Sequence, residues 1–420
     1  MTPSLAERIM MVAIPGFFVL MAIELLAARL MRRRVYRLND AIASIGLGVL
    51  SQVVGAFAKV LTIGLYAWLL PRVALFDLPA KSPWVWLVAL VLYDFCYYWL
   101  HRAGHEVGVL WAAHVVHHQS ERYNLSTALR QTGSGVLLGW IFYVPLAVLG
   151  VPVEVFAVVA VIDLLYQYWI HTELVPKLGW FDRVFASPSN HRAHHAVNDR
   201  YLDRNYGGLF ILWDRLFGTF VEEADDDPPR FGTRAPLRSW NPLWANVEVY
   251  AALAKDAWHA RRWGDKLRVW LKPPGWRPAD VAERFPKPAF DLARREYDPP
   301  LSRPMQGYAL FHFALLLGLG TQFLSHASAL HGLQALAFAG FVTTGLCALG
   351  ALLESRTWGL ALEAVRLVVL GLWPMLTADW SGMASPPVVA IAFPVIAGLS
   401  APVLWLAWRG NAGVSLAQAG

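Results

Sequence analysis

The sequence predicts an all-α integral membrane protein, a multi-span helical bundle with a histidine-rich di-metal site on its cytoplasmic side. Of its 420 residues, 56% are hydrophobic and only 16% are charged, and the mean hydropathy is +0.41. A soluble chain carries about 25% charged residues. Several apolar runs reach the roughly 20 residues that a helix needs to cross a bilayer. Nine of the thirteen histidines lie between residues 101 and 195.

The N-terminal third predicts three spans, at about residues 8–30, 42–70 and 83–100. A basic cluster ends the first span and is expected to stay in the cytoplasm, because Lys and Arg flank the cytoplasmic ends of membrane helices. That cluster comprises Arg29, Arg32, Arg33, Arg34 and Arg37. By alternation the third span returns to the cytoplasm, so the first histidines begin at the cytoplasmic interface.

Two shorter apolar stretches, at about 133–150 and 153–170, follow the first histidines. They predict either two short spans or a re-entrant hairpin, and both return the chain to the same face. Residues 172–304 are polar. Four more spans are expected at about 305–327, 332–353, 357–376 and 386–408, which makes nine crossings in all. The ionisable residues His312, Glu363 and Arg366 lie within these last spans. For each of them pairing or partial exposure is favoured over the lining of a ligand cavity.

These patterns predict four parts of the chain. They are N-terminal transmembrane helices (1–82), a histidine-bearing catalytic domain (83–220), a cytoplasmic linker region (221–304) and C-terminal transmembrane helices (305–420).

The histidines form three groups with helical spacing and one single residue. They are His101 with His105, then His114 with His117 and His118, then His171, and then His191 with His194 and His195. Positions i, i+3 and i+4 share one face of a helix, so each group is expected to point in one direction. Neutral imidazole binds iron, copper, zinc and nickel. Because a tetrahedral zinc takes about four ligands, nine histidines predict two metal ions.

Composition excludes other classes of protein. The net charge of +6 comes from arginines beside the spans, so no nucleic-acid partner is expected. Cys96 and Cys347 lie in apolar segments and predict small buried residues without a disulfide.

A metal transporter would place ligands along a path through the bilayer. A one-sided cluster favours an enzyme that acts on a lipid tail, with a non-catalytic metal-binding protein as the alternative.

Longer motifs around the histidines resemble the fatty acid hydroxylase superfamily, the membrane di-iron oxygenases that include sterol desaturases. The resemblance is nearest to the alkylglycerol monooxygenase branch and is specific over about residues 90–220. The residues that carry it are Asp94-Phe-Cys-Tyr-Tyr-Trp-Leu-His101-Arg102, His105-Glu106, the 114–118 histidines with Glu121, Tyr123-Asn-Leu-Ser-Thr-Ala-Leu-Arg-Gln131, Tyr166-Gln-Tyr-Trp-Ile-His171-Thr-Glu173, Pro188-Ser189, the 191–195 histidines, Asn205-Tyr206 and Trp213–Phe220. Asn190 departs from the branch, which is expected to carry a further histidine there.

The resemblance implies two iron ions, O2 as oxidant and tetrahydrobiopterin as the separate electron donor. The implied reaction hydroxylates the carbon next to the ether bond of an alkylglycerol and yields a fatty aldehyde and a glycerol derivative. The alternative within the superfamily is a hydroxylase or desaturase of a fatty acyl chain, sterol or aminolipid, with a ferredoxin or cytochrome b5-type donor. The composition favours a bacterial inner membrane, or the endoplasmic reticulum in a eukaryote, with the active site on the cytoplasmic side.

All nine histidines of the 101–195 segment are the expected metal ligands. Glu106 is the expected catalytic carboxylate, as an acid/base or as an acceptor for an imidazole N–H. Its alternative is a surface ion pair with Arg102 at i−4. Weaker polar candidates are Asn124, Asn198 and Tyr206, and either a supporting or a purely structural role is open for Asp94 and Asp163.

Overall fold

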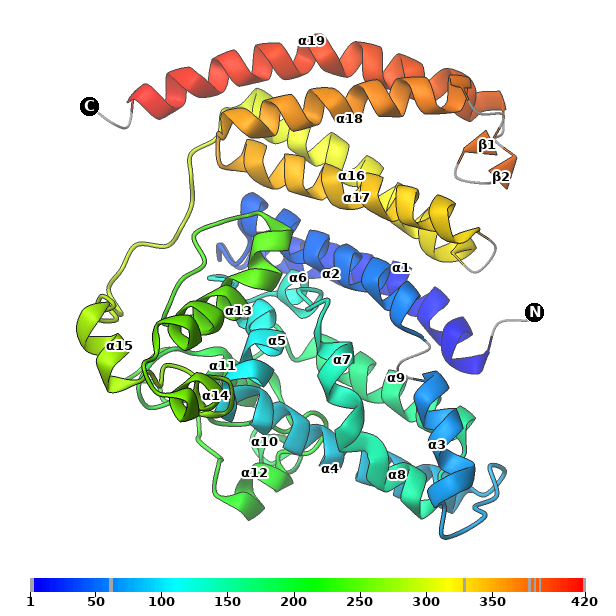
Figure 1. The fold of residues 1–420 in the computed structure, drawn as a ribbon, viewed down its shortest axis with the longest axis vertical. Coiled ribbons are helices and arrows are strands. Elements are labelled where there is room, and N and C mark those ends of the chain that lie inside the picture. The colour runs from blue at the N-terminus through cyan, green and yellow to red at the C-terminus, as the bar shows by residue number, and fades with distance from the viewer. Residues whose placement is uncertain are drawn as a thin grey trace. The chain divides into compact units, whose positions relative to one another are not determined.

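The computed structural model describes residues 4–59, 63–327, 330–376, 379–380, 383–384 and 387–417 (Figure 1). The chain divides into two compact units. The first comprises residues 1–37, 57–237 and 246–295, and the second comprises residues 38–56, 238–245 and 296–420. The sequence-based domain boundaries stay predictions beside this spatial division.

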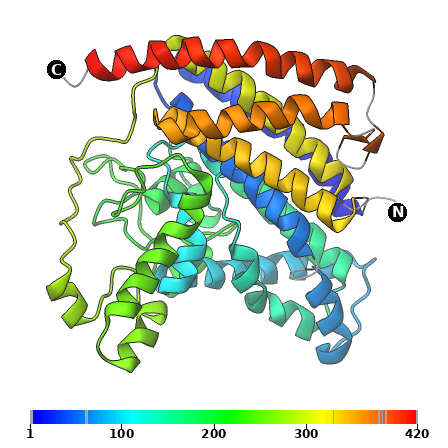
Figure 2. The ribbon, with the colours of Figure 1, turned by 45° about the horizontal axis from the view of Figure 1, so that its top comes forward.

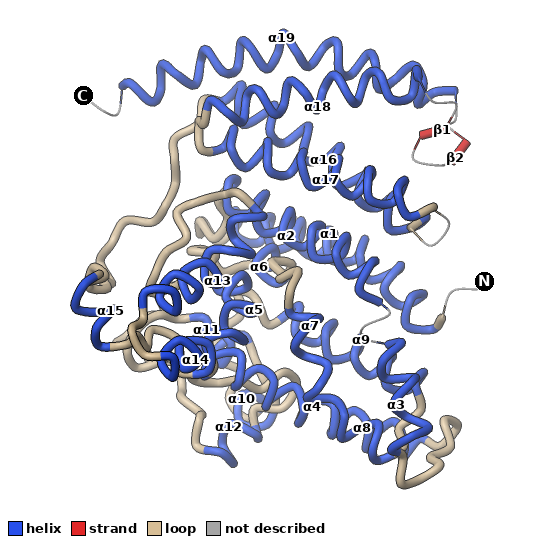
Figure 3. Tube along the Cα trace, viewed as in Figure 1, coloured by secondary structure: helices blue, strands red, loops and turns tan. Residues whose placement is uncertain are grey.

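The first unit is helical and contains the whole histidine segment (Figure 3). Its helices are α1 (Leu5–Leu30), α3 (Leu65–Val73), α4 (Pro83–Glu106), α5 (Gly108–His118), α6 (Leu125–Ala128), α7 (Gly135–Gly139), the 3-10 helix η2 (Trp140–Tyr143), α8 (Val144–Leu149), α9 (Val153–Trp169), α10 (Phe181–Val184), α11 (Pro188–His195), α12 (Leu212–Phe217), most of α13 (Pro242–His259), α14 (Trp263–Leu271) and α15 (Ala279–Arg284).

Helix α4 organises the packing of this unit. It packs on α5 and α9, while α1 packs on α9 and α6. A core between α3, α4, α8 and α9 buries Tyr66, Ala89, Leu146 and Val155. Helix α8 ends at Gly150 in the left-handed region, with φ of 91°, a conformation that favours glycine because it has no Cβ. The histidine-bearing ends of α4, α5 and α9 are thereby held by a packed apolar scaffold.

The second unit is the C-terminal helical group together with most of α2. Neighbouring helices pack in the pairs α16–α17, α17–α18, α18–α19 and α16–α19 (Figure 2). Its elements are α2 (Leu38–Lys59), α16 (Arg303–His326), α17 (Gly332–Leu353), α18 (Thr357–Leu376), the paired strands β1 (Asp379–Trp380) and β2 (Met383–Ala384), and α19 (Pro387–Ala417).

The ionisable residues predicted inside these helices pair with one another. Arg366 donates to both carboxylate oxygens of Glu363, at 2.7 and 2.6 Å, and its Nη2 lies 2.7 Å from Nδ1 of His312. All three side chains are buried. Mutual pairing is the arrangement that a low-dielectric interior demands of charged groups.

Seven of the described helices are long and apolar enough to cross a membrane. They are Leu5–Leu30, Leu38–Ala58, Pro83–Glu106, Arg303–His326, Gly332–Leu353, Thr357–Pro374 and Val388–Asn411. The expected count of nine crossings exceeds this number by two, and the apolar stretches at about 133–150 and 153–170, for which a re-entrant hairpin was the alternative, account for the difference. The stretch from 135 to 149 is broken into α7, η2 and α8, and α9 has only 17 residues. The broken stretch has no helix near the roughly 20 residues that a span needs, and α9 lies at the lower limit of about 17. The second expected span, 42–70, becomes α2 and α3, with residues 60–62 outside the described part.

Candidate metal centre

Four segments of the first unit bring the nine histidines together. The last turns of α4 carry His101 and His105, and α5 carries the next three. His171 lies two residues past the end of α9. The short helix α11 carries the last three; it begins with Pro188 after the N-cap Ser187, a sequence that favours helix initiation. Eight of the nine side chains are buried, and His114 is half-buried.

Within the described residues the imidazoles form two groups. The first group, called here the five-histidine group, contains His101, His105, His114, His118 and His194. The second, the four-histidine group, contains His117, His171, His191 and His195. In each group one ring nitrogen per residue lies within 4.8 Å of the others. The expectation that each triplet points in one direction is wrong: the outer residues of a triplet, at i and i+4, join one group, while the residue at i+3 joins the other.

Backbone carbonyls fix the tautomer of four of these rings. A carbonyl only accepts, so each Nδ1 that faces one must carry the proton and leave a lone pair on Nε2. The four bonds run from His101 to Tyr206 at 2.8 Å, from His117 to Arg130 at 3.0 Å, from His171 to Gln167 at 2.7 Å and from His194 to Arg204 at 2.8 Å. This is the arrangement in which metal-binding histidines are usually held.

The Nε2 atoms converge in a way that suits a cation. His171 Nε2 lies 3.1 Å from Nε2 of His117 and 3.1 Å from Nε2 of His191. Since His117 and His171 both protonate Nδ1, two lone pairs face each other, which is repulsive without a positive charge between them. Nitrogen ligands lie roughly 2.1 Å from a transition metal ion, so two of them at about a right angle are roughly 3.0 Å apart. The observed separation fits that geometry.

The five-histidine group shows similar separations between its Nε2 atoms. His118 Nε2 lies 3.2 Å from Nε2 of His105 and 3.0 Å from Nε2 of His114. The Nε2 atoms of His101 and His194 are buried and have no hydrogen-bond partner among the described residues. An unsatisfied buried acceptor costs about 1–3 kcal/mol, so its presence on two adjacent rings points to a ligand. Both groups therefore fit a metal ion.

Burial keeps seven of these imidazoles neutral. It lowers the pKa of His117 to about 4, with its bond to Arg130 opposing the shift. Burial is also the largest cause that lowers the pKa of His114, His118, His171, His191, His194 and His195 well below the usual value, and neighbouring imidazoles add to it. A neutral ring is the metal-binding form, so the cluster is ready for ligation at neutral pH.

Two buried carboxylates hold the loop that follows α11. Asp94 accepts from the backbone N–H groups of Leu209 and Phe210 and from Nε1 of Trp213. Asp214 accepts at 2.7 Å from the backbone N–H groups of Tyr206 and Gly207 and from Oγ1 of Thr219. This loop supplies the carbonyl groups of Arg204 and Tyr206 that orient His194 and His101. Asp94 thus supports the two rings indirectly, by holding the loop whose carbonyls orient them.

The same loop accounts for the Asn205-Tyr206-Gly207-Gly208 motif. A Cβ at position 208 would lie 2.7 Å from Cδ1 of Tyr97 and 3.0 Å from Oδ1 of Asp94. A Cβ at position 207 would meet the backbone carbonyl of Phe210. Glycine is required at both positions because the backbone passes against α4 and against its own turn.

We expect Gly207→Ala to destabilise the protein by about 1–3 kcal/mol, since the new methyl group meets backbone that cannot rotate away. The thermal unfolding midpoint in detergent should fall, and bound metal should fall with it because the loop orients His101 and His194. Gly264→Ala is the control. A Cβ there meets nothing within 4 Å, so its midpoint should stay equal or rise slightly. An unchanged midpoint for Gly207→Ala would show that the loop has room for the added methyl group.

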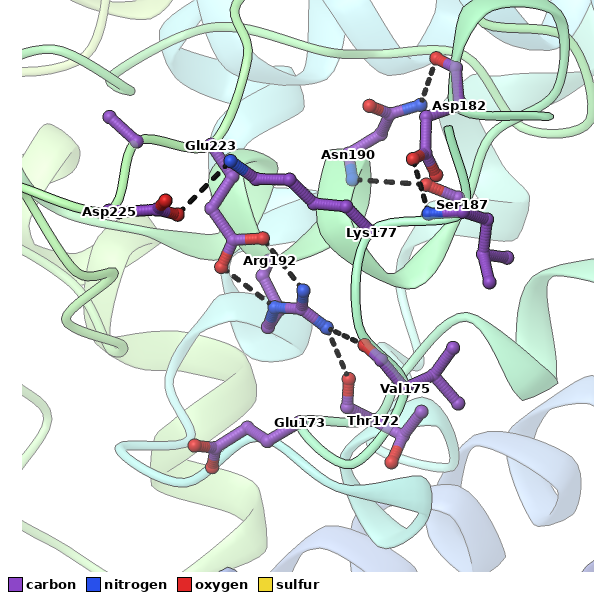
Figure 4. Close-up of polar contacts among 12 residues, drawn as sticks. Thr172, Glu173, Val175, Lys177, Asp182, Ser187, Asn190, Arg192, Glu223 and Asp225 are labelled. Carbon is purple, nitrogen blue, oxygen red and sulfur yellow. Dashed lines mark hydrogen bonds and ion pairs between the residues drawn. The ribbon is translucent and has the colours of Figure 1, made fainter. Parts of the chain in front are cut away.

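Arg192 is a supporting residue that the sequence reasoning did not name. It lies inside the last histidine triplet, and its guanidinium donates to both carboxylate oxygens of Glu223, at 2.8 and 2.7 Å (Figure 4). Its Nη1 also donates to the carbonyls of Thr172 and Val175, at 3.1 and 2.8 Å. Arg192 thereby ties the segment after His171 to α11. A charged residue at a mid-helix position between buried histidines was the available signal.

Asn190, the departure from the resembling branch, has a structural task. Its Nδ2 donates to the carbonyls of Asp182 and Phe185, at 3.0 and 3.2 Å (Figure 4). Its own carbonyl accepts from Nδ2 of Asn205 at 3.0 Å. These bonds hold the start of α11 against the preceding turn, so the asparagine takes part in positioning the helix that carries three histidines.

The remaining candidates occupy different places. Glu106 accepts from Nε of Arg102 at 2.9 Å, and its side chain is 44% exposed, as expected for the surface ion pair. Asp203, which the sequence reasoning missed, lies nearer the cluster: its Oδ1 is 3.4 Å from Nδ1 of His105. The Tyr206 hydroxyl is buried without a partner among the described residues, and its ring lies 5.4 Å from that of His105.

Asn124 and Asn198 hold backbone segments. Asn124 caps α6 and donates to the carbonyl of Val35 at 2.8 Å, while Asn198 accepts from the backbone N–H of Arg230 at 2.8 Å. Asp163 accepts from Nε2 of Gln167 at 2.6 Å. Since the carbonyl of Gln167 accepts from His171, Asp163 is connected to that ring through one residue, Gln167.

Comparison with known proteins agrees with this architecture. The fatty acid hydroxylase family matches residues 86–219, and the alkylglycerol monooxygenase C-terminal domain matches residues 305–391. The chain is 36% identical to the alkylglycerol monooxygenase of Danio rerio over 86% of this chain and 79% of that protein. It is 35% identical to that of Homo sapiens over 85% of this chain and 80% of that protein. No solved structure matches the chain.

The helical fold, the seven candidate spans and the buried histidine cluster define a membrane-bound oxygenase of the fatty acid hydroxylase class. Within that class, the chain belongs to the alkylglycerol monooxygenase family. It is a multi-pass membrane protein and a lipid monooxygenase.

Proposed function

We propose that this protein is a di-iron monooxygenase that hydroxylates the carbon next to the ether bond of an alkylglycerol. The observation that carries the proposal is the convergence of nine imidazoles, eight buried and one half-buried, into groups of five and four, in a member of this family. The hydroxylated product is a hemiacetal, which splits into a fatty aldehyde and a glycerol derivative.

Each histidine group would hold one iron. The five-histidine group offers His101, His105, His114, His118 and His194, and the four-histidine group offers His117, His171, His191 and His195. When bound, the two irons supply the electrons and oxidising power with which O2 attacks an unactivated C–H bond, chemistry that side chains alone do not provide. An ether oxygen stabilises electron deficiency on the adjacent carbon, so that carbon is the favoured target.

The protein's own contribution is positioning and exclusion of water. Carbonyls hold four rings with Nε2 free, the Asp94 and Asp214 carboxylates hold the loop behind His101 and His194, and burial removes competing water. Insertion of one oxygen atom into C–H and reduction of the other to water consumes two electrons and two protons. Asp203 beside His105 and the nearby Glu106 are the carboxylates through which protons would reach the group from the surface.

The electron donor is a separate molecule, which we propose is tetrahydrobiopterin. The chain has only two cysteines, too few for an iron–sulfur cluster held by four Cys, and both lie in apolar helices. We place the histidine groups on the cytoplasmic side of a bacterial inner membrane, because the basic cluster after the first span and the polar 172–304 region belong to one face. The endoplasmic reticulum is the equivalent membrane in a eukaryotic cell.

The test is turnover by the full chain in membranes supplied with iron, O2, tetrahydrobiopterin and an isotope-labelled alkylglycerol. We expect pterin-dependent release of labelled fatty aldehyde, and its loss in His118→Ala, because His118 contacts two other rings of its group. Iron is measured on the same samples.

Absence of aldehyde from a protein that carries two irons would overturn the ether-lipid assignment but not the di-iron site. An ornithine lipid hydroxylase of Rhizobium tropici, 32% identical over 34% of this chain, directs the next assay to an aminolipid with a ferredoxin donor.

A further inference from the structure

The polar region between the two sets of spans contains an apolar surface that the catalytic site does not use. It lies at the junction of α13 and α14, both in the first unit from residue 246 onward. Trp258 and Trp263 are each 81% exposed, Leu267 is 69% exposed and Leu271 is 67% exposed. Positions 263, 267 and 271 are spaced by four, so they form one stripe along α14. We call these four residues the tryptophan–leucine edge.

The opposite side of α14 is firmly attached to the histidine-bearing core. Val269 is buried, α14 packs on α5, and the backbone N–H of Gly108 donates to the carbonyl of Lys272 at 2.9 Å. Lys266 Nζ donates to the carbonyls of Ala257 and Trp258, at 3.0 and 2.9 Å, and so joins the two helices. The exposed edge is therefore displayed by an ordered helix pair and is not the surface of a loose segment.

Basic side chains surround the tryptophan–leucine edge. Residues 255–272 contain six Lys or Arg and two Asp, a net charge of +4. Arg261, Arg262 and Lys272 are exposed, while Asp256 is buried in a pair with Arg277 at 2.7 Å. Large exposed tryptophans rimmed by basic residues match the boundary between anionic headgroups and acyl chains.

The direction of α14 suits such a boundary. In Figure 1, α14 is viewed nearly end-on, whereas α1 and α4, the candidate spans of the same unit, run across the picture. A helix that lies across the direction of the spans runs parallel to the membrane plane. The bilayer is also the one partner that a seven-span protein always has beside it.

We propose that the α13–α14 pair is an interfacial membrane anchor, whose tryptophan–leucine edge enters the headgroup region of an anionic lipid surface. Because α14 packs directly on α5, which carries His114, His117 and His118, the anchor holds the bilayer surface against the helices of the metal centre. This inference rests on the membrane location of the protein and is independent of which lipid it oxidises.

The test places a polarity-sensitive fluorophore at single engineered cysteines in the full chain, reconstituted in nanodiscs of phosphatidylcholine and phosphatidylglycerol. Leu267→Cys probes the edge. Asp225→Cys is the matched control in the same unit, since the Asp225 side chain is 95% exposed in an acidic loop. The native Cys96 and Cys347 are buried, and the unsubstituted chain measures their background labelling. Quenching is recorded with nitroxide-labelled lipid and with aqueous iodide.

We expect lipid nitroxide to quench the label at 267 at least threefold more than the label at 225, and iodide to show the reverse order. Lipid quenching at 267 should fall in the Arg261→Glu/Arg262→Glu variant. Iodide quenching at 267 equal to that at 225 would overturn the proposal, and so would shielding from both quenchers, which would indicate a second copy of the chain on this face. Full lipid quenching in the double variant would overturn the requirement for anionic headgroups.

Discussion

His171→Ala is expected to reduce bound iron from about two to about one per chain and to lower turnover by at least about 100-fold. The estimate is a lower bound because loss of a residue that merely orients a ligand costs about 10–100-fold. His171 belongs to the group of four, where its Nε2 lies 3.1 Å from those of both His117 and His191. Removing it takes away a quarter of that group and leaves the five-histidine group complete.

Metal analysis by mass spectrometry, together with the aldehyde assay, checks this expectation. His326→Ala is the control, because His326 is exposed at the end of α16 and outside both groups. It should keep both irons and full turnover. A His171→Ala protein that is folded by size-exclusion chromatography and still holds two irons would show that the four-histidine group is not a metal site.

Arg192→Ala is expected to destabilise the fold by about 3–5 kcal/mol, the range for removing one partner of a buried ion pair. The loss leaves the half-buried Glu223 carboxylate unpaired and the carbonyls of Thr172 and Val175 without their donor. Since the segment after His171 is then free to move, the second iron should bind more weakly. Arg192→Lys should rescue little, because an ammonium cannot form the paired bonds of a guanidinium.

Thermal midpoints of Arg192→Ala, Glu223→Ala and the double variant form the matching cycle, with iron content measured on each. The double variant should be less destabilised than the sum of the singles, because neither charge is then left unpaired. Lys177→Ala is the control shown in the same view (Figure 4): it breaks the exposed pair with Asp225, worth about 0–1 kcal/mol. Equal effects of Arg192→Ala and Lys177→Ala would remove Arg192 from its positioning role.

Helical spacing and composition alone led to the membrane class, the long spans and the nine histidines. These features are local: a span is a run of apolar residues, and a histidine triplet is a pattern within two turns of helix. Nine crossings were expected from hydropathy, whereas seven of the described helices qualify as spans. One reason is that residues 135–149 break into three short helices. A break within an apolar run leaves hydropathy unchanged.

The division of labour among the histidines was decided by the tertiary structure. Spacing placed each triplet on one face, yet His117 and His194 each join the group opposite to their neighbours in sequence. Side chains at i and i+3 point in different directions around the helix axis. Because the two histidine groups lie side by side, this difference is enough to send rings of one triplet into different groups. The supporting contacts of Arg192 with Glu223 and of Asp203 with His105 likewise join residues that are far apart in the sequence.

The sequence by itself thus determined which residues are present for metal chemistry and that the chain lies in a membrane, because both follow from residue type and short-range period. Only the tertiary structure decided which imidazoles share a group, which carbonyls set their tautomers and which carboxylates hold the loop behind them. Those properties depend on how α4, α5, α9 and α11 pack, and packing is a relation between segments that no single segment encodes.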